Sequence, residues 1–206
     1  MSSQTIIRRL LTAALLAIMP FTALAHVESG VIGDGGFVSG MLHPVTGVDH
    51  VVAMVAVGLW GAILGQPAIW VLPVAFPLVM AAGSILGIIG IPVPAIDIGV
   101  ALSGIVLGAM VATVSRPPLA VAFFLISIFA VYHGYPHGAA LPDFGMPLLY
   151  ISGFVISTGL LHLSGVALGL LFRWRRGQLV VRVTGCIIAF VGAYYLLNSL
   201  GSTQAV

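Results

Sequence analysis

The stretch that decides the fold joins a polar start to a long apolar run. Residues 43–65 read HPVTGVDHVVAMVAVGLWGAILG, with two imidazoles and a carboxylate in the first eight positions. Ionisable side chains inside a membrane span are costly and rare, so this cluster indicates a functional site on a transmembrane helix. Pro44 suits the first turn of a helix, which predicts that His43 is the N-cap and shares a helix face with His50. Asp49 is a candidate ligand or the acceptor that orients an imidazole.

The composition indicates an integral membrane protein. Of the 206 residues, 60% are hydrophobic and 6% are charged, and the mean hydropathy is +1.21. That leaves too little polar surface to coat a soluble globule. The chain has no Lys, which excludes a phosphate-binding loop of the Walker A type, and its few Arg give no indication of nucleic-acid binding. The single Cys186 excludes an internal disulfide and a Cys-based metal site.

The first 25 residues have the pattern of a cleavable signal peptide. Arg8 and Arg9 form a basic start, an apolar core follows, and residues 23–25 read Ala-Leu-Ala. The alternative is an uncleaved first transmembrane helix, but the apolar core is short for a span. Cleavage would leave one domain, residues 26–206, that begins with an exposed, Gly-rich lead-in.

The rest of the chain predicts an all-α, polytopic membrane protein with a bundle of six transmembrane helices. Each of six apolar segments approaches the roughly 20 residues that cross the hydrocarbon, and we place them at about 45–65, 67–90, 95–114, 118–134, 147–172 and 178–200. Glycines spaced four apart, as at Gly83 and Gly87, would let the helices approach closely. With the mature N-terminus in the periplasm of a bacterial inner membrane, every mature Arg is cytoplasmic, as the positive-inside rule requires.

This topology brings most histidines to the outer face of the membrane. The candidate metal ligands are His43, Asp49, His50, Asp97, His133, His137 and His162. Asp97 opens the third helix, the pair His133 and His137 brackets the outer end of the fourth, and His162 lies halfway down the fifth helix or deeper. Imidazole and carboxylate without thiolate suit Ni²⁺, Co²⁺ or Zn²⁺ better than Mg²⁺ or Ca²⁺. Each residue also has a structural alternative, as a helix cap or an interhelical hydrogen bond.

Two motifs resemble those of the HupE/UreJ family of bacterial nickel/cobalt permeases. The first is the run from His43 to His50, followed by Met54 and Val57-Gly58-Leu59-Trp60, and the second is the run from His133 to Ala139. The resemblance covers nearly the whole chain. It implies uptake of Ni²⁺ or Co²⁺ across the inner membrane, in the context of hydrogenase, urease or cobalamin assembly, with His43, Asp49, His50 and His133 as the metal residues. This chain differs from the family pattern at Ala140, where the family usually has glutamate.

We therefore expect a secondary metal permease that is not an enzyme and carries no prosthetic group. Two alternatives stay open. One is an intramembrane zinc hydrolase, in which three histidines hold Zn²⁺ and a carboxylate activates its water. The other is a sensor or accessory membrane protein that binds metal without transporting it.

Overall fold

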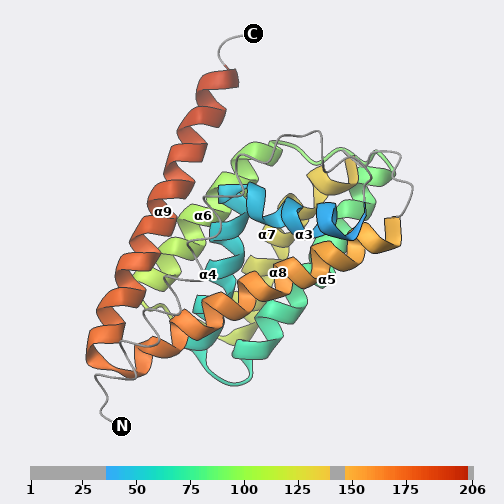
Figure 1. Ribbon diagram of the computed structural model, residues 1–206. Helices are drawn as coiled ribbons and strands as arrows, with labels where there is room; N and C mark the ends of the chain where they lie inside the picture. Colours follow the sequence, from blue (N-terminus) through green and yellow to red (C-terminus); the bar gives the residue numbers. More distant parts are fainter. Residues whose placement is uncertain (1–35, 140–146, 204–206) are drawn as a thin grey trace.

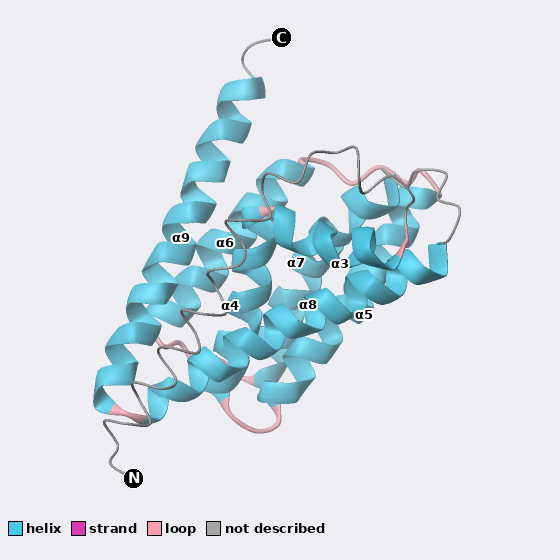
Figure 2. Cartoon of the chain, in the orientation of Figure 1, coloured by secondary structure: helices cyan, strands magenta, loops and turns pink. Residues whose placement is uncertain are grey.

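The computed structural model describes residues 36–139 and 147–203, which form helices joined by short loops (Figures 1 and 2). No strand occurs among these residues. The predicted signal peptide, most of the lead-in, Ala140 and Asp143 lie outside them. The helices are α3 (Phe37–Thr46), α4 (Val48–Leu64), α5 (Ala68–Ile88), α6 (Ile96–Ala112), α7 (Leu119–Ala139), α8 (Pro147–Leu170), the short 3₁₀ helix η1 (Leu171–Arg173) and α9 (Arg175–Thr203).

Helices α4 to α9 fall on the six predicted apolar segments. In the described part of the chain, four helices are long and apolar enough to cross a membrane, namely α5, α7, α8 with η1, and α9. A fifth span results if α3 and α4, which meet at 85°, are counted together, whereas α6 is shorter. The structure therefore confirms an all-helical membrane protein with four to five candidate spans, and the six-span prediction remains a prediction.

Helix α4 is the centre of the bundle. It packs against α8, α5, α6 and α9, and Met54, Val57, Leu59 and Trp60 are fully buried on it. The Trp60 indole N–H donates to the carbonyl oxygen of Ser115 at 2.9 Å, which ties the end of α4 to the loop between α6 and α7. Around this centre, α5 pairs with α7 and α6 with α9 (Figure 1).

Close helix contacts depend on glycine. A Cβ on Gly58 of α4 would collide with the backbone carbonyl of His162 on α8, and one on Gly165 of α8 would collide with that of Val55. Gly83 and Gly87 similarly face the backbone of α7. Lipid supplies no hydrophobic force between helices, so such close backbone packing holds the bundle together.

The predicted helix start at His43 is wrong. Residues His43 and Pro44 lie inside α3, and the chain breaks at Gly47, whose extended backbone separates α3 from α4. Packing explains the difference: α3 lies against α8 with Gly40 facing the backbone of Tyr150, and this contact holds a helix that continues through a proline. His43 and His50 therefore do not share one helix face.

The fourth apolar segment extends further than predicted. Helix α7 continues through Pro136 to Ala139, so His133 and His137 are both helical rather than bracketing its end. A proline inside a helix removes a backbone hydrogen bond. Helix α5 supports this segment from outside, because Ser84 donates its hydroxyl to the Gly134 carbonyl at 2.9 Å and Gly138 packs on the backbone of Ser84.

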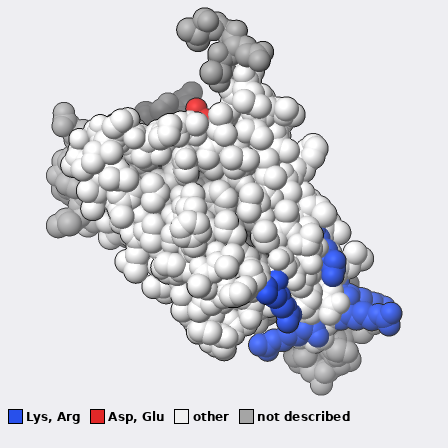
Figure 3. Space-filling model, turned by 180° about the vertical axis from the view of Figure 1, so that it is seen from behind, with Lys and Arg blue, Asp and Glu red and all other residues white. Residues whose placement is uncertain are grey.

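The charged side chains separate to opposite ends of the molecule. Figure 3 shows the Arg side chains gathered at one end and an acidic side chain at the other. Arg116 lies over the Phe172 ring, with its guanidinium carbon 5.6 Å from the ring centroid, and Arg182 reaches the backbone of Ala112. The described Arg are Arg116, Arg173, Arg175, Arg176 and Arg182, all of them exposed.

Candidate functional site

The first motif contributes two histidines from two helices. His43 is exposed on α3 and His50 is buried in the first turn of α4, with 7% of its surface exposed. The Asp49 carboxylate accepts a hydrogen bond from the backbone N–H of His50 at 2.9 Å. The Tyr195 hydroxyl of α9 forms a hydrogen bond with the backbone of Asp49. Asp49 thus satisfies an N–H group at the start of α4.

The second motif contributes His133 and His137 from one face of α7. They are four residues apart, a spacing that places side chains on the same side of a helix. His133 is buried with 3% of its surface exposed, whereas His137 is partly buried. The packing of α7 on α5 described above fixes both positions.

These four histidines form a row. His43 Nε2 and His137 Nδ1 form a hydrogen bond of 3.0 Å, in which one nitrogen donates its proton to the other. The ring centroids of His137 and His50 are 5.3 Å apart, and those of His50 and His133 are 5.2 Å apart. We call His43, His137, His50 and His133 the outer row. Burial increases along it, from the exposed His43 to the buried His133.

Several nitrogens near the row lack hydrogen-bond partners. Nε2 atoms of His50, His137 and His162 are buried, and none has a partner in the described structure. Buried polar groups in proteins are nearly always hydrogen-bonded, so each exception needs an explanation. Three such exceptions on imidazoles leave buried nitrogens that are chemically able to bind a ligand.

Ser103 of α6 orients His133. The fully buried Ser103 hydroxyl lies 2.6 Å from the Val100 carbonyl oxygen and 2.8 Å from His133 Nε2. A carbonyl can only accept, so the hydroxyl hydrogen goes to Val100 and the oxygen accepts a proton from His133 Nε2. The lone pair of neutral His133 is then on Nδ1. Sequence reasoning missed Ser103, because a lone Ser on an apolar helix carries no signal of its partner.

Two aromatic rings flank the row, and sequence reasoning missed both. Phe154 of α8 lies against His137, with ring centroids 4.9 Å apart. Phe76 of α5 lies between His133 and His162, at 5.9 Å and 5.6 Å between ring centroids. Phe side chains are so common in membrane helices that only the fold distinguishes these two.

The remaining candidates stand apart from the outer row. His162 is deeper in the bundle on α8, with 1% of its surface exposed. Asp97 is exposed in the first turn of α6, and in the described residues no hydrogen bond or ring contact joins it to a histidine. Nor do any three His, Cys, Asp or Glu side chains of residues 36–139 and 147–203 gather into one metal-binding group. The histidines form successive pairs instead.

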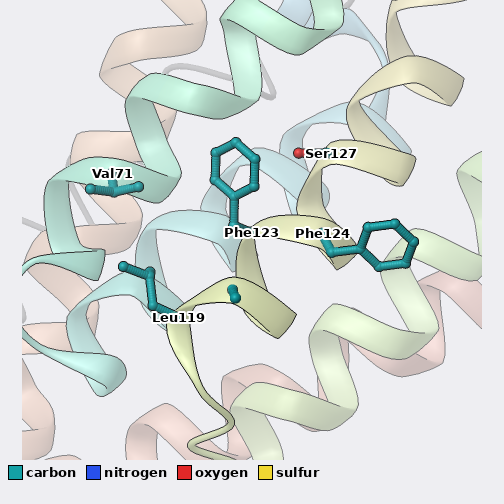
Figure 4. Close-up of a pocket in the computed structure, with 6 residues that line it drawn as sticks. Val71, Leu119, Phe123, Phe124 and Ser127 are labelled. Carbon is teal, nitrogen blue, oxygen red and sulfur yellow. The ribbon is translucent and has the colours of Figure 1, made fainter.

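A surface hollow on α5 and α7 has different chemistry. It measures about 500 Å³ and is lined by Val71, Leu119, Ala120, Phe123, Phe124 and Ser127 (Figure 4). These residues come from the first halves of α5 and α7, whereas His133 and His137 are near the end of α7. With one hydroxyl among apolar side chains, it offers no set of metal ligands.

Comparison with known proteins agrees with the two motifs. The family model described as HupE / UreJ protein matches residues 13–195. Protein HupE of Rhizobium leguminosarum bv. viciae is 40% identical over 183 residues, which cover 89% of this chain and 95% of that protein. No solved structure matches the chain. With a family model and a relative that both extend over most of its length, the chain belongs to the HupE/UreJ family.

Proposed function

We propose that this protein is a secondary permease that takes up Ni²⁺ or Co²⁺ across a bacterial inner membrane. The observation that carries the proposal is the outer row, four imidazoles that extend from an exposed ring to a buried one, with partnerless buried nitrogens on its two middle rings, His137 and His50. An ion that enters such a row can exchange from one pair of nitrogens to the next. Family membership supports the proposal, because the resemblance implies the same cargo.

The spacing of the first pair suits an ion. Two nitrogens that each lie about 2.0–2.1 Å from a metal can be no more than about 4 Å apart, and His43 Nε2 and His137 Nδ1 are 3.0 Å apart. Imidazole nitrogen favours borderline first-row ions over Mg²⁺ and Ca²⁺. Pairs bind more weakly than a closed set of three or four ligands, and a transport site must release what it binds.

The distribution of charge supports an orientation. The described Arg side chains lie at one end of the molecule, and the positive-inside rule assigns that end to the cytoplasm (Figure 3). The outer row, at the start of α4 and near the end of α7, then opens to the periplasm. Metal would enter there and supply a hydrogenase, urease or cobalamin pathway inside the cell.

The zinc hydrolase alternative finds no support in the described structure. A catalytic zinc site uses three protein ligands with one open position. In residues 36–139 and 147–203 no three His, Cys, Asp or Glu side chains form such a group. The pairwise arrangement fits passage of an ion better than a closed catalytic centre.

Uptake of radioactive nickel and cobalt tests the proposal in cells that produce the wild type, His50→Ala or His137→Ala. We expect each variant to lose at least about tenfold in uptake, the scale on which metal sites respond to lost ligands or their partners. Asn198→Ala, at an exposed position on α9, is the control. If both histidine variants accumulate metal like the wild type at equal membrane abundance, the permease assignment is wrong.

A further inference from the structure

The deeper histidine has a defined tautomer. His162 Nδ1 lies 2.9 Å from the backbone carbonyl oxygen of Met54. That oxygen can only accept, so Nδ1 carries the proton and the lone pair of the neutral ring is on Nε2. Nε2 is buried and has no hydrogen-bond partner in the described structure. The fold therefore holds a fixed nitrogen lone pair inside the bundle and leaves it unused.

A second unused polar atom lies on the same face of α8. Thr158, one helical turn before His162, is fully buried, and its Oγ1 likewise has no partner among the described residues. This side chain could have bonded a carbonyl of its own helix, as Ser152 and Ser164 do. Two orphaned polar atoms one turn apart indicate that the face serves a ligand.

Phe76 lies beside both this face and the outer row. Its ring is in contact with both His133 and His162, and it offers no lone pair to a metal. Among the described residues no ring contact joins His162 to a histidine of the outer row, so His162 and Thr158 lie apart from it.

We propose that His162 Nε2 and Thr158 Oγ1 form a second, inner binding site for the permeating divalent ion. The inference rests on the proposed function for the identity of the cargo. One imidazole selects a borderline first-row ion, a neutral hydroxyl adds one oxygen, and water retained by the ion completes its shell. In the absence of a carboxylate the site binds weakly, which suits release toward the cytoplasm.

Binding of Co²⁺ to the purified full-length protein in detergent tests the inner site. Equilibrium dialysis gives the number of ions bound, and the Co²⁺ absorption spectrum reports the ligands. We expect His162→Gln, whose amide can still donate to the Met54 carbonyl, to bind one Co²⁺ fewer than the wild type. Thr158→Val, which keeps the shape of the side chain, should lower the affinity for the same ion at least about tenfold. Gly159→Ala is the matched control, because a Cβ there meets open space.

Transport separates the inner site from the outer row. Thr158→Val should lower the maximal uptake rate and leave the metal concentration for half-maximal uptake unchanged, because capture occurs at the outer row. Equal Co²⁺ binding by the wild type, His162→Gln and Thr158→Val would overturn the inner site, and the two atoms would then serve water alone. That result would not touch the permease assignment, which fails only if the His50 and His137 variants transport normally.

Discussion

The two ends of α4 show opposite solutions to the same problem. At its start, His50 lies among other imidazoles and leaves a buried nitrogen without a partner. Further along, Gly58 lets the backbone of α8 approach, and the Trp60 indole N–H donates to the Ser115 carbonyl oxygen. The first region keeps polar atoms unpaired in a setting where pairing is the rule, and the second satisfies its polar atoms and fills its space. The difference assigns the fold's stability to the second region, and it agrees with the proposal that the first region binds the ion.

The largest effect is expected in the packed region. Gly58→Val places a side chain against the His162 backbone carbonyl, which cannot move without displacing α8. We expect loss of folded protein, measured as the monodisperse fraction after detergent extraction. Gly159→Ala, on the helix that faces Gly58, should behave like the wild type. A normal yield of folded Gly58→Val protein would show that α4 and α8 are far enough apart at residue 58 to accommodate a side chain.

A smaller effect is expected where a side chain only orients a ligand. Ser103→Ala removes the acceptor of His133 Nε2–H, so the ring is free to turn or change tautomer. Loss of such a partner typically lowers metal affinity or activity about 10–100-fold. We therefore expect the metal concentration for half-maximal uptake to rise about tenfold. Ser152→Ala is the control, because that hydroxyl bonds only the Leu149 carbonyl. A change in maximal rate alone would contradict an orienting role.

Acid should weaken the outer row without harming the packed region. Imidazole must be neutral to bind metal, so protons compete with the ion. Burial disfavours a charged ring, so uptake should hold through the ordinary imidazole range at about 6.5, fall only at lower external pH, and recover when the pH is restored. The pH dependence is measured as the initial rate of nickel uptake at a constant concentration of free Ni²⁺. Uptake that stays constant down to the lowest pH at which the cells remain intact would argue against imidazole ligands.

The smallest effect is expected outside both regions. Cys186 is exposed on α9 and is the single cysteine of the chain. Cys186→Ser should leave uptake within about twofold of the wild type, because surface substitutions away from special features change little. The resulting cysteine-free chain then allows a topology test. A cysteine introduced at Gln178, near the Arg cluster, should react with a membrane-impermeant reagent only after the cells are opened.

The grouping of most histidines was predicted from residue type alone. Histidines within apolar segments are informative because burying them in a membrane is costly, and four of the predicted residues do lie in one row, His43, His137, His50 and His133, whereas His162 lies deeper. For the carboxylates Asp49 and Asp97, residue type alone left a structural role open. A carboxylate at a helix start has a structural use as a cap, and Asp49 does accept a backbone N–H there.

By itself, the sequence determined the membrane class, the positions of the long helices and the ionisable residues in them, because hydropathy and charge act locally along the chain. Only the tertiary structure decided which rings meet. The break at Gly47 turns α3 across the bundle, and the packing of α7 on α5 carries a helix through Pro136, so that His43 meets His137 rather than His50. Ser103 and Phe76 acquire their roles from helices far away in the chain. Such contacts depend on how glycine-lined backbones pack, and no local pattern in the sequence encodes that.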